Sequence, residues 1–361
     1  MGVAPAYLLT HEHVASIVST VGLDRFMDQL IERLEVAFRD FDVAKTKIPI
    51  RDGFSYQVPH MGLLEWMPIL HSGQEMLMKL VGYHPENPDK YQLPTILSSF
   101  SLYNSRTGLL KAIVDGTLVT ALRTGAASAL ASRKMGWPES VAVGLIGCGA
   151  QAVTQLHALS RIFNFQTVYF YDTDKRSVDS FPDRCSSFGF SGDMIAAKLD
   201  DVVKNADVLC IATSVDVGAG PVFRQLGTKS HLHINAVGSD FPGKVEVPVE
   251  LLRQAYVSPD CLEQAVKEGE CQQLKKDEIG LPLTELLKAE ANDLQEQLTV
   301  FDSTGWALED LVVTQLVLEY AQEHGIGEKI EIVADECDPK NPYESLERHP
   351  QESAKVFKVV V

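Results

Sequence analysis

A glycine-rich turn is the first feature of this sequence that could do chemistry. Gly147, Gly149 and Ala152 have the spacing G-x-G-x-x-A, directly after the apolar run 141–146. In such a turn the first glycine permits a tight bend, the second lets the backbone approach a pyrophosphate, and the third small residue allows close helix–strand packing. The N–H groups that open the next helix then face the phosphates. The turn therefore predicts a dinucleotide site.

An acidic residue follows the next apolar run, as the dinucleotide motif requires. Asp172 comes directly after 167–171 and about 20 residues after Gly149. A carboxylate at this place accepts hydrogen bonds from ribose hydroxyls and repels a 2′-phosphate, which favours NAD over NADP. A glycine turn with an unrelated surface aspartate is the simpler explanation. The combination of strand, turn, helix and acid favours the cofactor site.

Asp240 is a candidate for proton transfer. It follows the predicted strand 233–237, at the carboxyl end of that strand. Ligands bind outside the carboxyl ends of strands in open α/β sheets. A carboxylate shielded from water has a raised pKa and can both accept and return a proton. The competing explanation is that Asp240 merely begins a turn with residues 241–243.

Three basic residues could hold the carboxylate of a small substrate. Arg51, Lys79 and Arg123 offer charge-assisted donors, and arginine offers two in a fixed fork. Lys79 lies within the apolar run 76–81 and Arg123 interrupts an alanine-rich helix. Exposure on alternate strand positions or on a solvated helix face is the simpler explanation for these two. Glu65 also has apolar neighbours, and an edge strand would expose it.

The elements that must position these side chains form two groups. In the first, the apolar stripe 27, 31, 34 and 38 predicts a helix from about Asp24. Short runs between Gly, Pro and Asn residues predict a largely antiparallel sheet over 48–110. The alanine-rich helix is expected over 118–135.

From Ser140 the sequence changes to apolar strands that alternate with helical stretches. This alternation predicts a doubly wound α/β domain with a parallel sheet. A final helix is expected from Leu308 to about Glu323 with Gly325 as its C-cap, and the charged tail after Asp335 is expected to be an exposed arm. The strands are expected over 141–146, 167–171, 208–212, 233–237 and 298–301.

Composition excludes several classes of protein. The 361 residues suggest about two domains, and 45% hydrophobic with 22% charged residues is ordinary for a globular protein. The net charge of −17 and the lack of a Lys/Arg-rich run argue against a nucleic-acid partner. No apolar run reaches the roughly 18 residues of a membrane span.

The N-terminus and the cysteines favour a cytoplasmic protein. The first residues lack the basic segment and apolar core of a signal peptide. The six cysteines are dispersed, without C-x-x-C pairs or zinc spacing. They are therefore expected to be reduced thiols, and no metal site is expected.

The chain resembles the ornithine cyclodeaminase/mu-crystallin family over nearly its whole length. Within the family it is most similar to bacterial lysine cyclodeaminases, through ATSV (212–215), GAGPV (218–222), HLH (231–233) and EGECQQL (268–274). The segments that carry the family resemblance are EWMP (65–68), Lys79 with GYHP (82–85), LPT (93–95), ALRT (121–124), the Gly147 turn, NAVGSD (235–240) and VFDSTG (300–305).

The resemblance implies a fold and a reaction. It implies that a Rossmann-type NAD-binding domain, 136–307, is inserted into an α+β substrate-binding and dimerisation domain, 1–135 with 308–361, and that the protein is a homodimer. NAD⁺ takes a hydride from Cα of a diamino acid, the terminal amine attacks the resulting iminium carbon and ammonia leaves. The same NADH then reduces the cyclic imine, so lysine gives pipecolate and ornithine gives proline.

The resemblance also implies roles for individual residues. It favours Asp240 as the catalytic acid and base, and assigns Arg51, Lys79 and Thr304 to the substrate, with Glu65 facing its ammonium end. Together with the glycine turn, it implies a set of cofactor-binding residues, with Arg123 beside the phosphates: Thr95, Arg123, Thr124, Gly147, Gly149, Ala150, Gln151, Asp172, Thr213, Val237, Gly238, Ser239, Lys244 and Ser303.

Three functions stay open on the sequence. The first is an amino-acid cyclodeaminase, with lysine ahead of ornithine as its substrate. The second is an NAD(P)-dependent imine reductase or amino-acid dehydrogenase, which would change the redox state of its cofactor at each turnover. The third is a ligand-binding protein of the mu-crystallin kind without turnover, against which the presence of Asp240, Lys79 and Arg123 argues.

Overall fold

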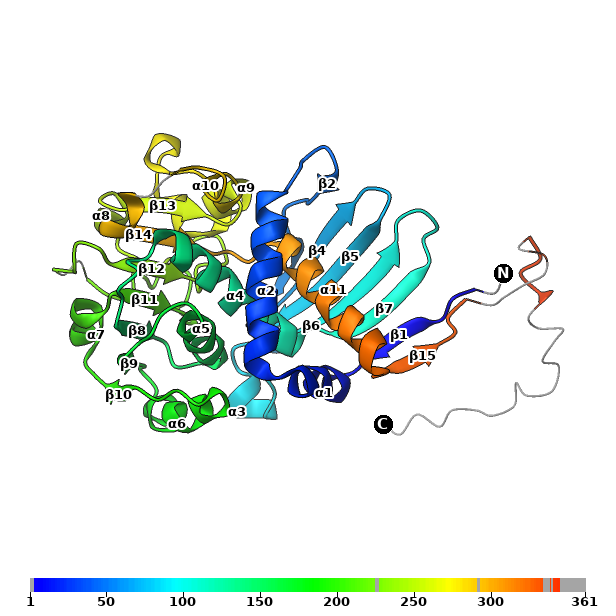
Figure 1. The fold of residues 1–361 in the computed structure, drawn as a ribbon, viewed down its shortest axis with the longest axis horizontal. Helices are drawn as coiled ribbons and strands as arrows, with labels where there is room; N and C mark the ends of the chain where they lie inside the picture. The colour runs from blue at the N-terminus through cyan, green and yellow to red at the C-terminus, as the bar shows by residue number, and fades with distance from the viewer. Residues whose placement is uncertain (1–2, 225–226, 291–292, 334–337, 339, 345–361) are drawn as a thin grey trace.

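The chain folds into two β-sheets that lie side by side, with long helices packed between and over them (Figure 1). The computed structural model describes residues 3–224, 227–290, 293–333, 338 and 340–344. The arm expected after Asp335 lies mostly outside these residues. A parallel sheet beside a largely antiparallel one confirms the predicted combination of an α/β and an α+β unit. No helix within the described ranges is long and apolar enough to cross a membrane.

The first sheet has the strand order β15-β1-β7-β6-β5-β4-β2, and β3 also pairs with β4. All neighbours are antiparallel except β1 and β7. This confirms the sheet predicted over 48–110. The strands are β1 (Ala6–Leu9), β2 (Thr46–Lys47), β3 (Asp52–Tyr56), β4 (Gly62–His71), β5 (Glu75–Tyr83), β6 (Ile96–Asn104), β7 (Leu110–Asp115) and β15 (Glu328–Ile330).

The register of this sheet sorts its side chains onto two faces. Glu65 on β4 pairs with Val81 on β5, and Met67 pairs with Lys79. Because paired residues share a face, Glu65 and Lys79 are diagonal neighbours on the inner face. The Cα atoms of such neighbours are about 7–8 Å apart. β4 is flanked by β3 and β5, so Glu65 does not lie on an edge strand. The outer face carries the exposed apolar side chains Phe54, Leu64, Leu80 and Leu97.

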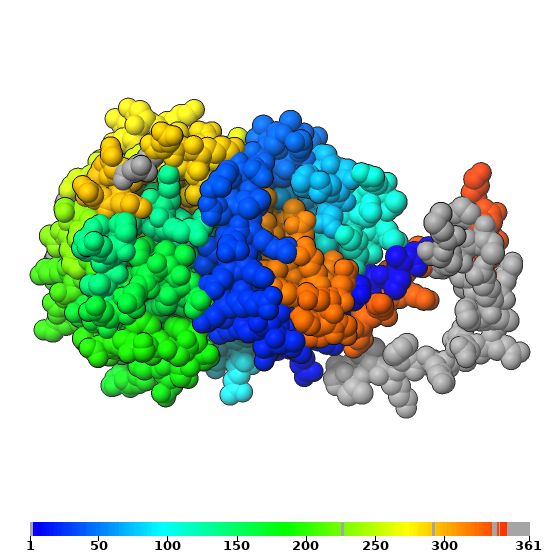
Figure 2. Space-filling model, viewed as in Figure 1, coloured from blue at the N-terminus to red at the C-terminus, as the bar shows by residue number. Residues whose placement is uncertain are grey.

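Helices cover the inner face in two layers. α1 (His11–Val21), α4 (Thr117–Met135) and α11 (Ala307–His324) contact the strands, and α2 (Leu23–Arg39) packs across these helices. The stripe predicted at 27, 31, 34 and 38 lies on α2 and is at most 2% exposed, which confirms it. Figure 2 shows α2 beside α11 at the surface, although they come from opposite ends of the chain. A short helix, α3 (Asn87–Tyr91), lies between β5 and β6.

The second sheet is parallel throughout, with the order β10-β9-β8-β11-β12-β14-β13. The chain order reverses between β8 and β11, and ligands bind outside the carboxyl ends of strands at such a point. All five predicted strands are present, whereas β10 and β13 lacked a clear sequence signal. The strands are β8 (Ala142–Ile146), β9 (Thr167–Tyr171), β10 (Asp193–Ala196), β11 (Val208–Ile211), β12 (His233–Ala236), β13 (Tyr256–Pro259) and β14 (Thr299–Asp302).

Helices fill both faces of the parallel sheet and connect it to the first sheet. α4 packs on α5, β12 and β14, so a helix that covers the first sheet also covers the second. Arg161, next to α5, binds Asp24 and Asp28 on α2 at 2.7 and 2.8 Å. The helices are α5 (Ala150–Ser160), α6 (Lys175–Cys185), α7 (Leu199–Asn205), α8 (Val249–Leu252), α9 (Leu262–Glu268) and α10 (Leu283–Leu286), with 3-10 turns at Ser186–Phe188, Glu270–Gln273, Lys276–Glu278 and Asp293–Glu296.

Candidate active site

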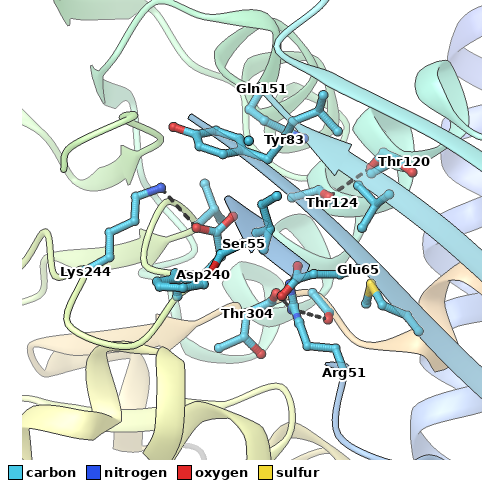
Figure 3. A pocket seen from close by; sticks show the side chains of 18 of the residues that line it. Arg51, Ser55, Glu65, Tyr83, Thr120, Thr124, Gln151, Asp240, Lys244 and Thr304 are labelled. Carbon is cyan, nitrogen blue, oxygen red and sulfur yellow. Dashed lines mark hydrogen bonds and ion pairs between the residues drawn. The ribbon is translucent and has the colours of Figure 1, made fainter. Parts of the chain in front are cut away.

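A cavity of about 270 Å³ lies where the inner face of the first sheet meets the carboxyl ends of the parallel strands (Figure 3). Strands β3 to β5, helix α4 and the loops after β11, β12 and β14 contribute its walls. The fold therefore brings together residues that are far apart in the sequence. The cavity is lined by these site residues predicted from the sequence: Arg51, Glu65, Lys79, Arg123, Thr124, Gln151, Val237, Asp240, Lys244, Ser303 and Thr304.

Two buried cations share one corner of the cavity. Lys79 Nζ lies 3.0 Å from Asp310 Oδ1, and the side chain of Lys79 is 1% exposed. Arg123 contacts Asp310 Oδ1 at 3.0 Å through Nε and Glu309 Oε2 at 2.7 Å through Nη1. Both cations therefore point inward, and the simpler explanation that they are solvated is wrong. Asp310 and Glu309 begin α11, so this helix supplies their counter-charges.

Burial changes the ionisation of this corner. It lowers the pKa of Lys79 to about 8, although Asp310 opposes the shift, and it raises the pKa of Glu309 to about 7. Burial also disfavours the charged form of Asp310, but Arg123 and Lys79 outweigh it and keep the pKa of this carboxyl below its ordinary value. Burial therefore weakens the negative charge of Glu309, and the two cations of this corner can receive a substrate carboxylate.

Arg51 is surrounded by oxygen atoms of the protein itself. Its Nε lies 2.8 Å from Glu268 Oε1, and its Nη1 lies 3.7 Å from Glu65 Oε2. Its Nη2 donates to the carbonyl oxygen of Gly305 at 3.0 Å and to that of Thr304. Figure 3 shows Arg51, Glu65 and Thr304 gathered on one side of the cavity. Arg51 therefore balances two carboxylates and fixes the loop after β14.

The two carboxylates beside Arg51 are shifted toward their protonated forms. Burial raises the pKa of Glu65 and that of Glu268, the latter to about 7, and Arg51 partly opposes both shifts. A carboxylate in such surroundings gains most from a cationic partner. This side of the cavity can therefore receive an ammonium group.

Asp240 lies on the loop after β12 and faces the cavity beside Lys244 (Figure 3). Its Oδ1 is 3.0 Å from Lys244 Nζ, which also lies 5.3 Å from the centre of the Tyr83 ring. Burial lowers the pKa of Lys244, but Asp240 and Tyr83 outweigh it, so the pKa is raised and the ammonium stays charged. The Asp240 side chain is 36% exposed, so it is less shielded than the sequence argument requires.

The glycine turn has the properties that a dinucleotide needs. Gly147 has φ +90°, and a Cβ there would lie 2.5 Å from the carbonyl oxygen of Ala212. A Cβ on Gly149 would meet no atom within 4 Å, and α5 begins after it without a side-chain cap. Asp172 Oδ2 accepts a hydrogen bond from Cys148 N at 2.7 Å, so the acid lies against the turn. These residues fit a pyrophosphate at the start of α5.

The comparison with known families agrees with this geometry. The model of the ornithine cyclodeaminase/mu-crystallin family matches residues 11–325. The chain belongs to this family. Among curated members of the family, the L-lysine cyclodeaminase of Streptomyces rapamycinicus is 38% identical over 339 residues, which cover 93% of this chain and 98% of that protein.

Solved structures of family members have the same fold. A lysine cyclodeaminase studied for its recognition of L-lysine, L-ornithine and L-2,4-diaminobutyric acid superposes with a TM-score of 0.90 and 43% identity, covering 94% of this chain and 99% of the other. An archaeal alanine dehydrogenase dimer with bound NAD superposes with a TM-score of 0.80 and 33% identity, covering 91% and 99%.

Some of the predicted residues lie outside the cavity wall. Thr213 N and Gly238 N both donate to the buried carboxylate of Glu246, at 2.7 and 2.8 Å. Ser239 Oγ donates to the carbonyl oxygen of Lys244 at 2.6 Å. The others outside the wall are Thr95, whose carbonyl oxygen accepts from His84 N, and the residues of the dinucleotide turn, Gly147, Gly149, Ala150 and Asp172.

The hydroxyl group of the predicted residue Thr304 is already bound by neighbouring side chains. Thr304 Oγ1 donates to Asp260 Oδ1 at 3.0 Å and accepts from Gln264 Nε2 at 2.8 Å.

Several charged residues of the site were not predicted. Asp260, Glu268, Glu309 and Asp310 are all buried. Acids at the start or end of a helix are common on solvated surfaces, so their sequence positions gave no signal. Within the described ranges, no group of His, Cys, Asp or Glu could hold a metal ion.

Proposed function

We propose that this chain is an NAD-dependent cyclodeaminase that converts L-lysine to L-pipecolate and releases ammonia, with L-ornithine to L-proline as a second reaction. One observation carries the proposal. A buried carboxylate, Glu65, and a buried cation, Lys79, are diagonal neighbours on one sheet face, in the same cavity as Asp240. The cavity therefore offers an acid and a base of the protein to the two oppositely charged ends of a diamino acid.

In this proposal the two charged sides of the cavity orient the substrate. Lys79 and Arg123 receive its carboxylate, since both cations line the same corner of the cavity. Glu65, held by Arg51, receives the terminal ammonium group. Binding at both ends brings the terminal amine close to the α-carbon, so ring closure becomes intramolecular. An amino acid without a second amine would bring no ammonium group to Glu65, which would keep Arg51 as its cationic partner.

Asp240 is the proposed acid and base. It accepts a proton from an ammonium group of the substrate and returns one to the departing ammonia. Lys244, 3.0 Å away, holds the carboxylate in place. The turn at Gly147 and Gly149 binds the NAD pyrophosphate, and Asp172 binds the ribose, beside the cavity wall formed by Gln151. When bound, NAD supplies a reversible hydride acceptor, so the reaction is redox-neutral overall.

One assay separates the proposed function from its alternatives. Ammonia is measured from lysine, ornithine and 2,4-diaminobutyrate with trace NAD⁺, while absorbance at 340 nm follows NADH. We expect many turnovers of ammonia per NAD⁺ and no net NADH, with lysine as the best substrate. Stoichiometric NADH formation would instead identify a dehydrogenase. Tight NAD binding without turnover of any of the three would identify a ligand-binding protein.

We further propose that the protein is a homodimer of the cytoplasm. The outer face of the first sheet leaves Phe54, Leu64, Leu80 and Leu97 between 36% and 67% exposed, which favours a protein partner on this face. The archaeal alanine dehydrogenase of the same fold is a dimer. The cysteines of the described ranges are free thiols, as expected in a reducing compartment.

A further inference from the structure

We infer that Glu246 is a positioning residue that fixes the Asp240 loop for catalysis, at the end of a chain of three buried carboxylates. The inference rests on the proposed function, because Asp240 is the group that Glu246 would position. Glu246 is 0% exposed, does not line the cavity, and has no role in the chemistry proposed above.

The Glu246 carboxylate joins the ends of two neighbouring strands. Its Oε1 accepts from Thr213 N at 2.7 Å and from Thr213 Oγ1 at 2.6 Å, and its Oε2 accepts from Gly238 N at 2.8 Å. Thr213 lies just after β11 and Gly238 just after β12. One side chain therefore fixes both turns on the side of the sheet where the cavity lies.

The same carboxylate closes the loop that carries Asp240. The loop runs from Gly238 to Glu246, so the Gly238–Glu246 bond joins its two ends. Inside it, Ser239 Oγ donates to the carbonyl oxygen of Lys244, and Lys244 Nζ binds Asp240. A Cβ on Gly238 would lie 2.3 Å from Glu246 Oε1, so the contact leaves no room for a side chain. Asp240 is thus held in a short loop that Glu246 closes at its base.

Two further carboxylates connect this loop to the parallel sheet. Glu270 accepts from Glu246 N at 2.7 Å and from Val247 N at 3.3 Å. Asp302, the last residue of β14, accepts from Glu270 N at 2.9 Å and from Cys271 N at 2.8 Å. Each carboxylate thus binds the backbone of the segment that carries the next one. The chain runs from the end of β14 to the base of the Asp240 loop.

The chemistry of these contacts indicates that they orient the Asp240 loop and do not mainly stabilise the fold. Burying a carboxylate costs free energy that an apolar side chain of similar volume would not. Glu246, Glu270 and Asp302 are all 0% exposed, and each accepts hydrogen bonds from two backbone N–H groups. Carboxylate oxygens aimed at N–H groups fix direction as well as distance, and a displacement of about 1 Å at a reacting group can cost about 100-fold in rate.

The test compares Glu246→Gln with Glu250→Gln, a control that removes an exposed carboxylate from the same segment. Glutamine keeps one acceptor but turns an NH₂ group toward an N–H donor. We expect kcat for ammonia release to fall about 10- to 100-fold with KM for lysine within threefold, faster amide exchange over 238–245, and partial rescue in Glu246→Asp. Glu250→Gln should match the wild type.

A milder variant covers the case in which Glu246→Gln fails to fold. Thr213→Val removes the hydroxyl donor to Glu246 and a long contact from Val215 N, but keeps the backbone donor Thr213 N, and we expect a several-fold fall in kcat with faster exchange over 238–245. Unchanged exchange, or faster exchange with kcat within twofold of the wild type, would overturn the inference. If the wild type releases no ammonia from any diamino acid, the proposed function fails, whereas the exchange data still decide whether Glu246 closes the loop.

Discussion

Asp240 is the residue on which the proposed chemistry depends most directly. Asn keeps its shape but cannot accept a proton, so Asp240→Asn should lower kcat for ammonia release by about 100-fold or more. NAD affinity should change little, because the glycine turn and Asp172 are the proposed contacts of the pyrophosphate and ribose, and Asp240 is not one of them. Asp216→Asn is the matched control, since Asp216 lines the same cavity and has no role in the proposed proton transfer. Substantial turnover by Asp240→Asn would remove this residue from the reaction.

Lys79 should give substrate binding a distinctive pH dependence. Its pKa of about 8 lies below the ordinary 10.5, so the ammonium group loses its proton as pH rises through about 8. The charge that attracts the substrate carboxylate is then lost, and KM for lysine should rise above pH 8 while kcat changes less.

The conservative variant separates this effect from titration of the substrate. Arginine stays protonated throughout this range, so KM of Lys79→Arg should rise less steeply between pH 8 and 9.5. Equal steepness in both proteins, measured by initial rates of ammonia release, would show that Lys79 does not control binding.

Sequence reasoning found the cations of the site more easily than their partners. Lys79 and Arg123 stand in apolar sequence, where a charge needs a special reason, and both prove to be buried. Glu309 and Asp310 lie in the first turn of a helix and Glu268 is the last residue of another, which are positions where solvated acids are common. They become buried only because α11 and α9 pack toward the cavity, and contacts over such sequence distances leave no local pattern.

At the scale of elements, the two glycines of the dinucleotide turn should behave differently. Gly147→Ala places a Cβ 2.5 Å from a carbonyl oxygen at φ +90°, which costs on the order of 1–3 kcal/mol of unfolding free energy. Gly149→Ala meets no neighbour, so its Tm should match the wild type, whereas its NAD affinity should fall about tenfold or more. Thermal denaturation and NAD titration together check both expectations. A lower Tm for Gly149→Ala would contradict this account.

The same scale shows which parts of the fold the sequence could reveal. β8 and β11 are buried on both faces and give continuous apolar runs, and α2 gives a clear helical stripe. β1 and β15 have four and three residues, and they become strands only by pairing with each other and with β7. Strands this short have too few residues to show a periodic pattern, so pairing with neighbouring strands determines whether they form.

At the scale of the whole molecule, the cavity depends on how the two sheets are held together. Glu65 and Lys79 come from the first sheet, and Asp240 comes from the second. α4 packs on both, and Arg161 binds Asp24 and Asp28 on α2 across the same junction. A substrate that contacts both sheets therefore meets walls that are already joined.

The outer face of the first sheet lies on the same strand as the substrate site and is the proposed dimer interface. Leu80 is 45% exposed and alternates along β5 with the buried Lys79, so the strand that carries a substrate residue also carries the apolar outer face. If this face pairs with a second copy, Leu80→Asp should dissociate the dimer, because an unpaired carboxylate would be buried. Sedimentation velocity at micromolar concentration should show a dimer for the wild type and a monomer for Leu80→Asp. Val36→Asp, at an exposed site on α2, should stay dimeric. A monomeric wild type would leave the face without the partner proposed for it.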